Sequence, residues 1–511
     1  MVTYSLINEL LLRHIEQGYS DRVVLIDKNK KYTYKELLDR VQSCANTNYF
    51  LKYSQGTIVS CLLPDSIETI IIFLALIYRG LVPCILNVNL VLDNYSEYIN
   101  NANCSCIIAT ASLLPALIHK TKHLGIDYIN CDELFSTKLN ISQLKQLKQL
   151  KVIVNEIAFC LYTSGTTGSP ALVLHRHQDP IIMNKNYGQI ILGLCENDII
   201  FTTSRLYFAY GLNTLFFALL NKAKLIIPPK ELLTPELIYQ QVVVHKPSVF
   251  FSVPTIYKRL LKVIPKNFGI HFFRLCISAG ENLPLSVFNA WKQQTSFSIL
   301  DGIGTTEVLS TFISNRPNNF KPGSTGYPVP GFKVKLLNVE TNQLTNPGDI
   351  GVLMVKGETY VTCYSNNQVE SKRRFIDGWF KTNDLFSIDL EGFYFYHGRV
   401  NDLIKVSGIW VYPYRIEQVL VTHPAVNEVI VIGRQETDGL LRLFGFIVLS
   451  ENYIPSEQLT TELKDWCKKH GAKHEYPHFV CYVDMIPKTS SGKSKRFLLA
   501  QQNIKDLEHV D

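Results

Sequence analysis

Short apolar runs rich in β-branched and aromatic residues alternate with amphipathic segments through most of this chain. Runs typical of buried strands lie at residues 57–63, 106–109, 223–227, 248–251 and 275–278. Between them, apolar residues recur at helical spacing, as at 236–245 and 255–263. This alternation predicts an α/β fold in which helices cover layered, largely parallel sheets.

The pattern changes after Ser324, where Gly/Pro turns separate short strands such as 333–337 and 351–355. Such spacing is typical of a small β-barrel or an antiparallel sheet. We therefore expect a large N-terminal domain over residues 1–398, whose last part, about 324–398, is β-rich.

A second change comes at the turn-forming pair Asn401 and Asp402. Beyond it, the pattern predicts helices at 416–422 and 459–470 and strands at 426–432 and 443–449. We expect a small, mobile α+β domain over residues 399–511, with a hinge near residue 401.

Composition narrows the class of protein. A chain of 511 residues should hold more than one domain, and 46% apolar with 19% charged residues is typical of a globular protein. The net charge of +7 is too mild and too dispersed to indicate nucleic-acid binding, but it suits small anions.

The sequence shows no strong signal for membrane insertion, secretion or disulfide formation. The apolar stretch 69–78 is too short to span a bilayer and is predicted to be a buried helix. The N-terminus lacks the pattern of a signal peptide. The twelve cysteines are scattered without metal-ligand spacing, so we expect free thiols and a cytoplasmic protein.

A loop rich in small hydroxyl residues follows the apolar run 157–161. Its sequence is Thr163-Ser164-Gly165-Thr166-Thr167-Gly168-Ser169-Pro170. Glycines let backbone N–H groups approach a ligand closely, and hydroxyls add donors without bulk. The segment indicates a polyphosphate site, with an ordinary solvated loop as the alternative.

A second polar segment, Asp301-Gly302-Ile303-Gly304-Thr305-Thr306-Glu307, follows a predicted strand at 297–300. Thr306 can donate to phosphate, and Glu307 offers a hard oxygen ligand for Mg²⁺. The alternative is a turn with a solvated glutamate.

Three further segments add polar groups. Lys381-Thr382-Asn383-Asp384 presents a carboxylate that can accept from a ribose diol. Residues 398–408 contain Arg399, and residues 487–496 contain Gly492-Lys493-Ser494. The last segment is not a P-loop, because Pro487 stands where that motif needs glycine.

Taken together and in this order, these segments resemble the adenylate-forming superfamily of acyl-CoA synthetases, adenylation domains and luciferases. The resemblance covers nearly the whole chain. The segments most similar to the benzoate–CoA ligase branch are 207–212, 249–255, 278–281, 301–307, 314–317 and 406–411.

This resemblance implies a two-step reaction. A carboxylate attacks the α-phosphorus of ATP to give an acyl-adenylate and pyrophosphate, and a thiol, usually that of coenzyme A, then displaces AMP. The implied cofactors and partners are ATP, Mg²⁺, a small carboxylic acid, and coenzyme A or the phosphopantetheine of an acyl or peptidyl carrier protein.

The resemblance also implies roles for individual residues. The catalytic residues would be Lys493, Thr306 and Glu307, with Glu307 as the metal ligand. The ATP and AMP site would comprise Thr163, Ser164, Gly165, Thr166, Thr167, Gly168, Gly280, Glu281, Asp301, Gly302, Ile303, Thr306, Asp384, Arg399 and Lys493. The acid site would comprise Phe208, Ala209, Tyr210, Gly302, Ile303, Gly304, Ser310 and Thr311. The hinge and thiol tunnel would comprise Asn401, Ser407 and Gly408.

Three positions depart from the family pattern. Ala171 stands where relatives usually carry lysine, which predicts weaker binding of ATP or pyrophosphate but retained adenylation. Asn383 replaces the usual glycine before Asp384, and asparagine tolerates positive φ better than most residues. Asn401 occupies the hinge, where relatives usually carry an acid or lysine.

The substrate and the acceptor stay open. Glycines on one wall and aromatic residues on the other favour a flat aryl acid, with a medium-chain or other small acid second. Benzoate ligases tend to carry histidine near Ser310, so a substituted ring is favoured over plain benzoate. Alternatives are an enzyme that loads a carrier protein and a catalytically weakened nucleotide-binding homologue. A homodimer is a further open point.

Overall fold

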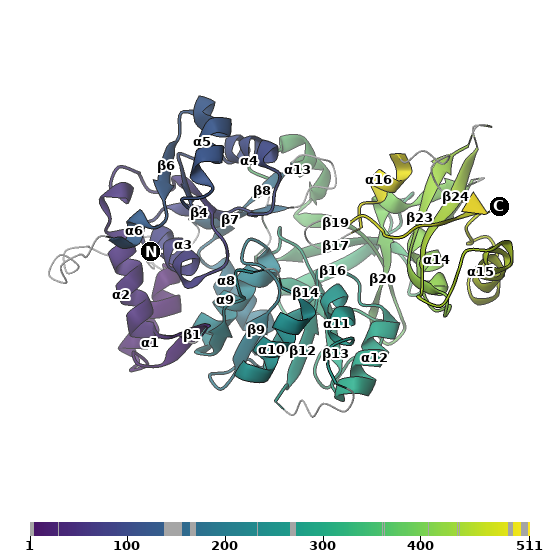
Figure 1. Cartoon of the computed structure of the whole chain (residues 1–511), viewed down its shortest axis with the longest axis horizontal. Helices are drawn as coiled ribbons and strands as arrows, with labels where there is room; N and C mark the ends of the chain where they lie inside the picture. The colour runs from purple at the N-terminus through teal and green to yellow at the C-terminus, as the bar shows by residue number, and fades with distance from the viewer. Residues whose placement is uncertain are drawn as a thin grey trace. The chain divides into compact units, whose positions relative to one another are not determined.

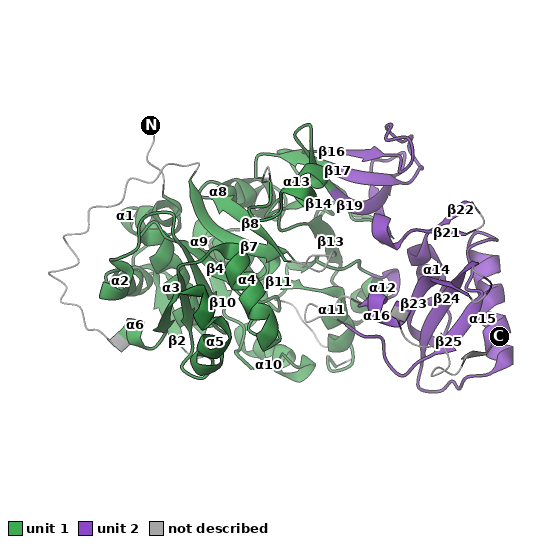
Figure 2. Cartoon of the chain, turned by 90° about the horizontal axis from the view of Figure 1, so that it is seen from above, with its two compact units in different colours: residues 1–283, 287–334, 355–381 green, residues 284–286, 335–354, 382–511 purple. Residues whose placement is uncertain are grey.

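The computed structural model describes residues 5–28, 30–136, 156–163, 170–231, 233–265, 272–359, 361, 363–406, 408–436, 438, 440–488, 494–501 and 509–510. The chain divides into two compact units (Figure 2). Unit 1 comprises residues 1–283, 287–334 and 355–381, and unit 2 comprises residues 284–286, 335–354 and 382–511. The sequence-based boundary at 398/399 remains a prediction.

Unit 1 contains a six-stranded sheet in the order β6-β5-β3-β4-β7-β8. Its strands are β3 (Ile58–Leu62), β4 (Val82–Ile85), β5 (Cys106–Ala109), β6 (Asp127–Asn130), β7 (Ile157–Thr163) and β8 (Ala171–Arg176). All neighbours are parallel except β7 and β8, which are antiparallel.

A nine-stranded sheet follows the order β15-β14-β13-β12-β11-β9-β10-β1-β2. Its strands are β1 (Val23–Asp27), β2 (Lys30–Thr33), β9 (Ile199–Thr202), β10 (Lys224–Ile226), β11 (Val249–Ser252), β12 (Leu275–Ser278), β13 (Ile299–Gly304), β14 (Thr311–Ser314) and β15 (Tyr327–Pro328). The strands from β1 to β13 in this order are parallel. At the edges, β2 is antiparallel to β1, β14 is antiparallel to β13, and β15 is antiparallel to β14. The predicted α/β fold with largely parallel sheets is confirmed.

Helices complete unit 1 (Figure 1). They are α1 (Arg13–Glu16), α2 (Tyr34–Ala45), α3 (Ile67–Tyr78), α4 (Tyr95–Ala102), α5 (Leu114–Thr121), α6 (Glu133–Ser136), α8 (Asp179–Met183), α9 (Ala209–Asn221), α10 (Pro235–His245), α11 (Pro254–Leu260) and α13 (Gln368–Arg374). Helix α12 (Leu285–Thr295) begins at the unit boundary.

Aromatic contacts establish the layers. Phe73 of α3 contacts both Phe159 of β7 and Phe216 of α9, at 5.8 and 6.3 Å between ring centroids. The next residue of α9, Phe217, stacks on Phe251 of β11. Helices α3 and α9 therefore lie between the two sheets. Phe250, on the opposite face of β11, belongs to a core cluster with residues of α10, α11 and α12.

Helix α3 confirms the buried helix predicted at 69–78. Its residues 69–77 are all buried, and Ser66 caps its start by accepting a hydrogen bond from the Thr69 N–H. A helix that is apolar all round has no solvent face, so burial between two sheets satisfies it. Within the described residues, no helix is long and apolar enough to cross a membrane.

The β-rich region after Ser324 forms a five-stranded sheet in the order β16-β17-β19-β18, with β20 paired to β19. These strands are β16 (Phe332–Leu337), β17 (Gly351–Gly357), β18 (Phe375–Ile376), β19 (Trp379–Ile388) and β20 (Tyr394–Arg399).

The C-terminal part of unit 2 is α+β. A hairpin of β21 (Ile404–Val406) and β22 (Ile409–Val411) precedes a four-stranded sheet of β23 (Val426–Gln435), β24 (Leu441–Leu449), β25 (Phe479–Tyr482) and β26 (His509–Val510). The helices are α14 (Pro413–Leu420), α15 (Glu457–His470) and α16 (Arg496–Gln501).

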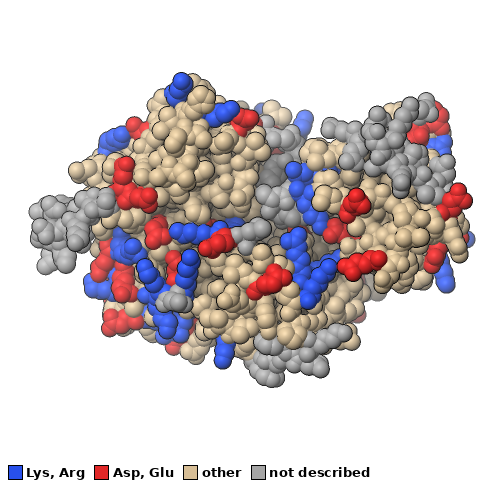
Figure 3. Space-filling view, viewed as in Figure 1, with Lys and Arg blue, Asp and Glu red and all other residues tan. Residues whose placement is uncertain are grey.

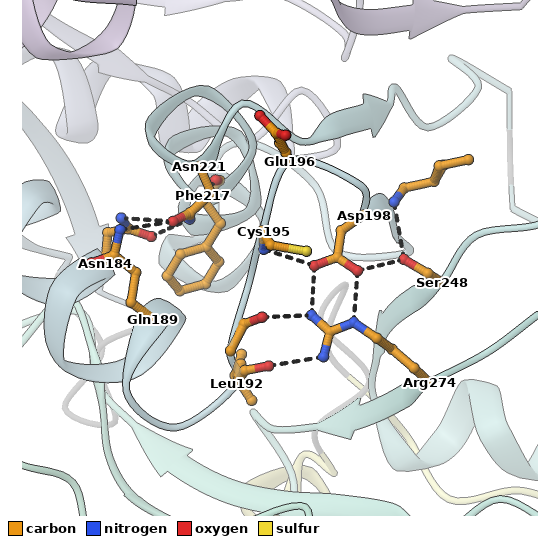
Figure 4. Close-up of polar contacts among 12 residues, drawn as sticks. Asn184, Gln189, Leu192, Cys195, Glu196, Asp198, Phe217, Asn221, Ser248 and Arg274 are labelled. Atoms are coloured by element: carbon orange, nitrogen blue, oxygen red, sulfur yellow. Dashed lines mark hydrogen bonds and ion pairs between the residues drawn. The ribbon is translucent and has the colours of Figure 1, made fainter.

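A buried aspartate ties together the amino ends of four parallel strands (Figure 4). Asp198, before β9, accepts hydrogen bonds from Arg274 Nε at 2.7 Å and Ser248 Oγ at 2.8 Å, residues that precede β12 and β11. Its carbonyl accepts from Lys224 N of β10 at 2.9 Å. This network fixes the sheet edge opposite the carboxyl ends of the strands.

The distribution of surface charge and the state of the cysteines agree with the predictions from the sequence. Lysine, arginine and acidic residues are intermixed on the face drawn in Figure 3, as a mild net charge predicts. All twelve cysteines are free thiols, and ten of them are buried.

Candidate active site

The carboxyl ends of β11, β12 and β13 bring a row of polar residues into register. Ser252 pairs with Ser278, and Ser278 pairs with Asp301. All three side chains are buried. Ligands of open α/β sheets bind outside this edge of the parallel strands, so the row marks the candidate site.

Asp301 is the most unusual member of the row. Burial raises the pKa of its carboxyl well above the ordinary value, although the nearby Gly302 N–H and Ser278 hydroxyl oppose the shift. Asp301 Oδ1, Ser278 Oγ and Thr305 Oγ1 are buried without a partner among the described residues. Buried polar atoms of this kind are costly unless a ligand or water satisfies them, so the cluster fits a polar ligand such as a nucleotide.

Gly280 and Glu281 follow β12. Gly280 has φ +87°, a conformation that residues with a side chain rarely adopt, and a Cβ added to it would lie 3.8 Å from Val253 Cγ1. Glu281 Oε2 accepts a hydrogen bond from Thr255 Oγ1 at 2.7 Å. The turn is therefore fixed next to the row.

The predicted acid site begins at the start of α9, where Phe208 is the N-cap residue and Ala209 the first helical residue. The Tyr210 hydroxyl lies 3.3 Å from Ser252 O and 3.2 Å from Ile277 O. Its ring meets Phe251 edge-on. The structure thus places Tyr210 against the carboxyl ends of β11 and β12.

The glycines of β13 serve strand packing. A Cβ on Gly302 would lie 2.8 Å from Thr311 Cγ2, and one on Gly304 would lie 2.6 Å from Ser310 O. Residues 302–304 continue the strand that the sequence placed at 297–300, and Ile303 pairs with Ile313 of β14. Ser310 and Thr311 are buried, and Ser310 Oγ donates to Thr311 O at 2.9 Å. These glycines therefore bring β14, and with it Ser310 and Thr311, next to the site.

Glu307 lies in the turn after β13, and the residue is 6% exposed. Tyr364 Oη donates to Glu307 Oε1 at 2.6 Å. Burial, and then the charge of Glu307, raise the pKa of Tyr364, so the phenol stays protonated. Thr306, next to Glu307, is half-buried, and its carbonyl accepts from Leu309 N.

Within the described part of the chain, no three or more His, Cys, Asp or Glu residues are grouped to hold a metal ion. Mg²⁺ usually takes one or two carboxylates, completing its shell with phosphate oxygens and water. Glu307 has the carboxylate that such a site would need.

The hydroxyl-rich loop lies mostly outside the described residues, as do Ser164, Gly165, Thr166, Thr167, Gly168, Ser407 and Lys493. Its described ends are Thr163 and Pro170. Thr163 of β7 pairs with Ala171 of β8 across the antiparallel strands. Ala171 is buried and forms an apolar cluster with Val173 and Tyr364.

Unit 2 contains the two residues that are predicted to bind the ribose. Asp384 and Arg399 pair in register across β19 and β20, with Arg399 Nε 3.2 Å from Asp384 Oδ1. The charge of Asp384 raises the pKa of Arg399. Asn383 lies within β19 and has φ +64°, a conformation that asparagine adopts more readily than most residues.

The predicted hinge and tunnel residues also lie in unit 2. Asn401 is exposed in the short helical turn Val400–Asp402. Gly408 has φ +84°, and a Cβ added to it would meet no atom of the described residues within 4 Å. The space beside Gly408 is therefore open among these residues.

Sequence reasoning missed Tyr364, Asn366 and Thr255. Tyr364 and Asn366 are more than fifty residues from the polar segments that they contact. The only available signal was the polar cluster Tyr364-Ser365-Asn366-Asn367, which reads as an ordinary turn.

Residues 12–365 match the AMP-binding enzyme family, and residues 415–493 match the AMP-binding enzyme C-terminal domain. The chain is 34% identical to a benzoate–CoA ligase of Thauera aromatica, covering 97% of this chain and 95% of that protein. It is 31% identical to a 4-hydroxybenzoate–CoA/benzoate–CoA ligase of Rhodopseudomonas palustris, covering 98% and 94% of the two chains.

A solved structure has the same fold over nearly the full length. The crystal structure of an anthranilate CoA ligase in complex with anthranoyl-AMP matches with a TM-score of 0.89 and 29% identity, covering 98% of this chain and 97% of that one.

Proposed function

Because the chain belongs to the AMP-binding enzyme family, we propose that it activates an aromatic carboxylic acid with ATP and transfers the acyl group to coenzyme A. The observation that carries this proposal is the full-length similarity to ligases of benzoate and hydroxybenzoate. The buried polar row at the carboxyl ends of β11, β12 and β13 supports it, since a nucleotide would satisfy these atoms.

The reaction proceeds in two steps that conserve atoms and charge. A carboxylate oxygen attacks the α-phosphorus of ATP, the α–β bridging bond breaks, and pyrophosphate leaves. The thiolate of coenzyme A then attacks the acyl carbon of the adenylate, and AMP leaves with the former carboxylate oxygen. In the first step an anion meets a polyanion, so the protein's task is to align the two and offset their charge.

Residues of unit 1 bind the nucleotide and the acid. Asp301, Gly280 and Glu281 line the base site, and Thr163 with the hydroxyls of Ser164, Thr166 and Thr167 binds the phosphates. Glu307 would hold Mg²⁺, which neutralises phosphate charge when bound. Tyr210, at the carboxyl ends of β11 and β12, forms the aromatic wall of the acid site.

Residues of the C-terminal part of the chain complete the first step. Asp384 and Arg399 bind the ribose hydroxyls, and Lys493 neutralises the α-phosphate and the attacking carboxylate. The proposal includes a C-terminal domain over 399–511 that turns about Asn401. In its second orientation, the open space beside Gly408 admits the pantetheine arm.

Ser310 favours a ring with a polar substituent. Its hydroxyl hydrogen is used on Thr311 O, so its remaining lone pairs can accept from a hydroxyl or amino group. Coenzyme A is the proposed acceptor, with a carrier-protein phosphopantetheine as the alternative.

A panel experiment tests the proposal. Pyrophosphate release is measured with benzoate, its amino and hydroxy derivatives, and straight-chain acids of two to eight carbons, each with coenzyme A or with a phosphopantetheinylated carrier protein. The proposal predicts release with aryl acids and an aryl-CoA product. If no acid causes release of pyrophosphate, acid activation is contradicted. If thioester forms only on the carrier protein, the carrier protein and not coenzyme A is the acceptor.

A further inference from the structure

We infer that Tyr364 is a positioning residue for Glu307. The inference rests on the proposed function, in which Glu307 binds the metal ion. Tyr364 would act by fixing one oxygen of this carboxylate and leaving the other for Mg²⁺.

The contact itself is short and buried. Tyr364 Oη lies 2.6 Å from Glu307 Oε1, and the tyrosine is 5% exposed. Among the described residues, this is the hydrogen bond that the Glu307 side chain makes. A charge-assisted hydrogen bond of this length restricts the carboxylate to one orientation. The other oxygen, Oε2, is then the one left to bind Mg²⁺.

The Tyr364 ring is itself held in place. Ala171 and Val173 of β8 form one apolar cluster with it, and Phe375 meets it edge-on at 5.3 Å between centroids. The backbone N–H of Tyr364 donates to Ser371 Oγ at 2.9 Å. A positioning group must have a fixed orientation of its own, and these contacts supply it.

The residues before Tyr364 bind the backbone of the Glu307 turn. Val361 N donates to Glu307 O at 3.0 Å, and Thr359 Oγ1 donates to Val308 O at 2.7 Å. The main chain of Glu307 is therefore held by Val361 and its side chain by Tyr364, three residues further along.

The residues after Tyr364 bind the start of β8. Ser365 N donates to Leu172 O at 3.0 Å, and Asn366 Oδ1 accepts from Leu172 N at 3.0 Å. Asn366 Nδ2 also donates to Pro170 O at 3.2 Å. Residues 359–366 thus connect the Glu307 turn to the strand that follows the hydroxyl-rich loop, and Tyr364 lies at the centre of this connection.

The test uses Tyr364→Phe, which removes one oxygen and keeps the ring. Tyr34→Phe is the matched control, because Tyr34 is also a buried phenol, whose hydroxyl donates to Leu219 O. Binding of Mn²⁺ to the full-length protein with a non-hydrolysable ATP analogue is followed by electron paramagnetic resonance. Loss of an outer-shell partner typically weakens metal binding by about 10- to 100-fold, and we expect a weakening in this range for Tyr364→Phe only.

A double-mutant cycle with Glu307→Gln separates positioning from general stability. If Tyr364 acts through the carboxylate, Tyr364→Phe has no further effect on Mn²⁺ binding in the Glu307→Gln background. Thermal unfolding of each variant reports the fold independently. The inference is overturned if wild type and Tyr364→Phe bind Mn²⁺ with equal affinity. It is also overturned if Tyr364→Phe lowers the Mn²⁺ affinity of Glu307→Gln as much as it lowers that of wild type.

The wild-type protein distinguishes this inference from the proposed function. If the wild type releases no pyrophosphate with any of the acids, the proposed function is contradicted. A wild type that is active and binds Mn²⁺ with nucleotide only as tightly as Tyr364→Phe contradicts the role of Tyr364 alone.

Discussion

Asp384 and Arg399 face each other across β19 and β20, and Arg399 Nε lies 3.2 Å from Asp384 Oδ1. Asp384 is buried, whereas the Arg399 side chain is 37% exposed. The cation therefore holds the carboxylate in a fixed position while one side of the pair stays accessible. Such a pair can receive the two hydroxyls of a ribose ring.

Asp384→Asn should weaken ATP binding more than it slows chemistry. A neutral amide replaces the charged acceptor, and a hydrogen bond to a charged group contributes about 1.5–3 kcal/mol, so KM for ATP should rise about tenfold or more. Initial-rate kinetics with varied ATP measure this change. Glu391→Gln, in the exposed turn between the same strands, is the charge control. An unchanged KM for ATP would exclude a ribose contact.

Lys493→Ala should nearly abolish adenylation and spare the second half-reaction. The lysine is proposed to offset charge only while the carboxylate attacks the α-phosphorus, so a supplied acyl-adenylate should still give thioester. Acid-dependent exchange of pyrophosphate into ATP and thioester formation from the adenylate are measured separately. Lys468→Ala, on the exposed face of α15, is the control. Equal loss of both half-reactions contradicts the proposed turning of the C-terminal domain.

Ser310→Ala should lower activity toward hydroxy- or amino-substituted rings relative to benzoate. The variant removes the lone pairs that a ring substituent would meet, and the ratio of kcat/KM values should change by about tenfold. Benzoate is the internal control because it shares everything except the substituent. A proportional loss for all aryl acids would place Ser310 outside the substituent site.

Asp198→Asn should destabilise unit 1 by about 1–3 kcal/mol at neutral pH, because it leaves Arg274 without its carboxylate. Burial alone would raise the pKa of Asp198, but hydrogen bonds from Arg274, the Cys195 N–H and Ser248 hold it below the ordinary value. Urea unfolding of both proteins measures the difference in the free energy of unfolding.

The pH dependence of this difference has a definite sign. A lowered folded-state pKa contributes stability above the unfolded pKa of about 3.9, and the contribution is lost as the pH falls below it toward the folded value. The difference between wild type and Asp198→Asn should therefore shrink in this acid range. Asp438→Asn, at an exposed pair with Arg442, should show little difference at any pH. A difference for Asp198→Asn that persists unchanged in acid would contradict the assignment.

Much of the fold was predictable because its signals are local. Strand 106–109 and the buried helix at 69–78 are continuous apolar runs, and both lie where the pattern placed them. The pairing order of the strands was not predictable, because it depends on contacts such as Phe73 with Phe216 that join distant parts of the chain.

Candidate site residues could be proposed only where their chemistry lies in one segment. Glu307 stood out by residue type, the resemblance pointed to Asp301, and Asn383 has the positive φ that asparagine tolerates. The packing of Gly302 against Thr311 and the contact of Tyr364 with Glu307 were not predictable, because each depends on tertiary placement. Ala171 is instructive: in the sequence it is a missing charge, and in the structure it is also a packing partner of Tyr364.

The central claim, attack of an aromatic carboxylate on the α-phosphorus of ATP, is tested most directly by oxygen transfer. The wild-type protein is incubated with ATP, Mg²⁺, coenzyme A and an aryl acid carrying ¹⁸O in both carboxyl oxygens, and the products are analysed by mass spectrometry. The account predicts AMP carrying one ¹⁸O atom, unlabelled pyrophosphate and an aryl-CoA that retains the other ¹⁸O. Formation of ADP with ¹⁸O in inorganic phosphate, or thioester formation with no ¹⁸O in AMP, would contradict it.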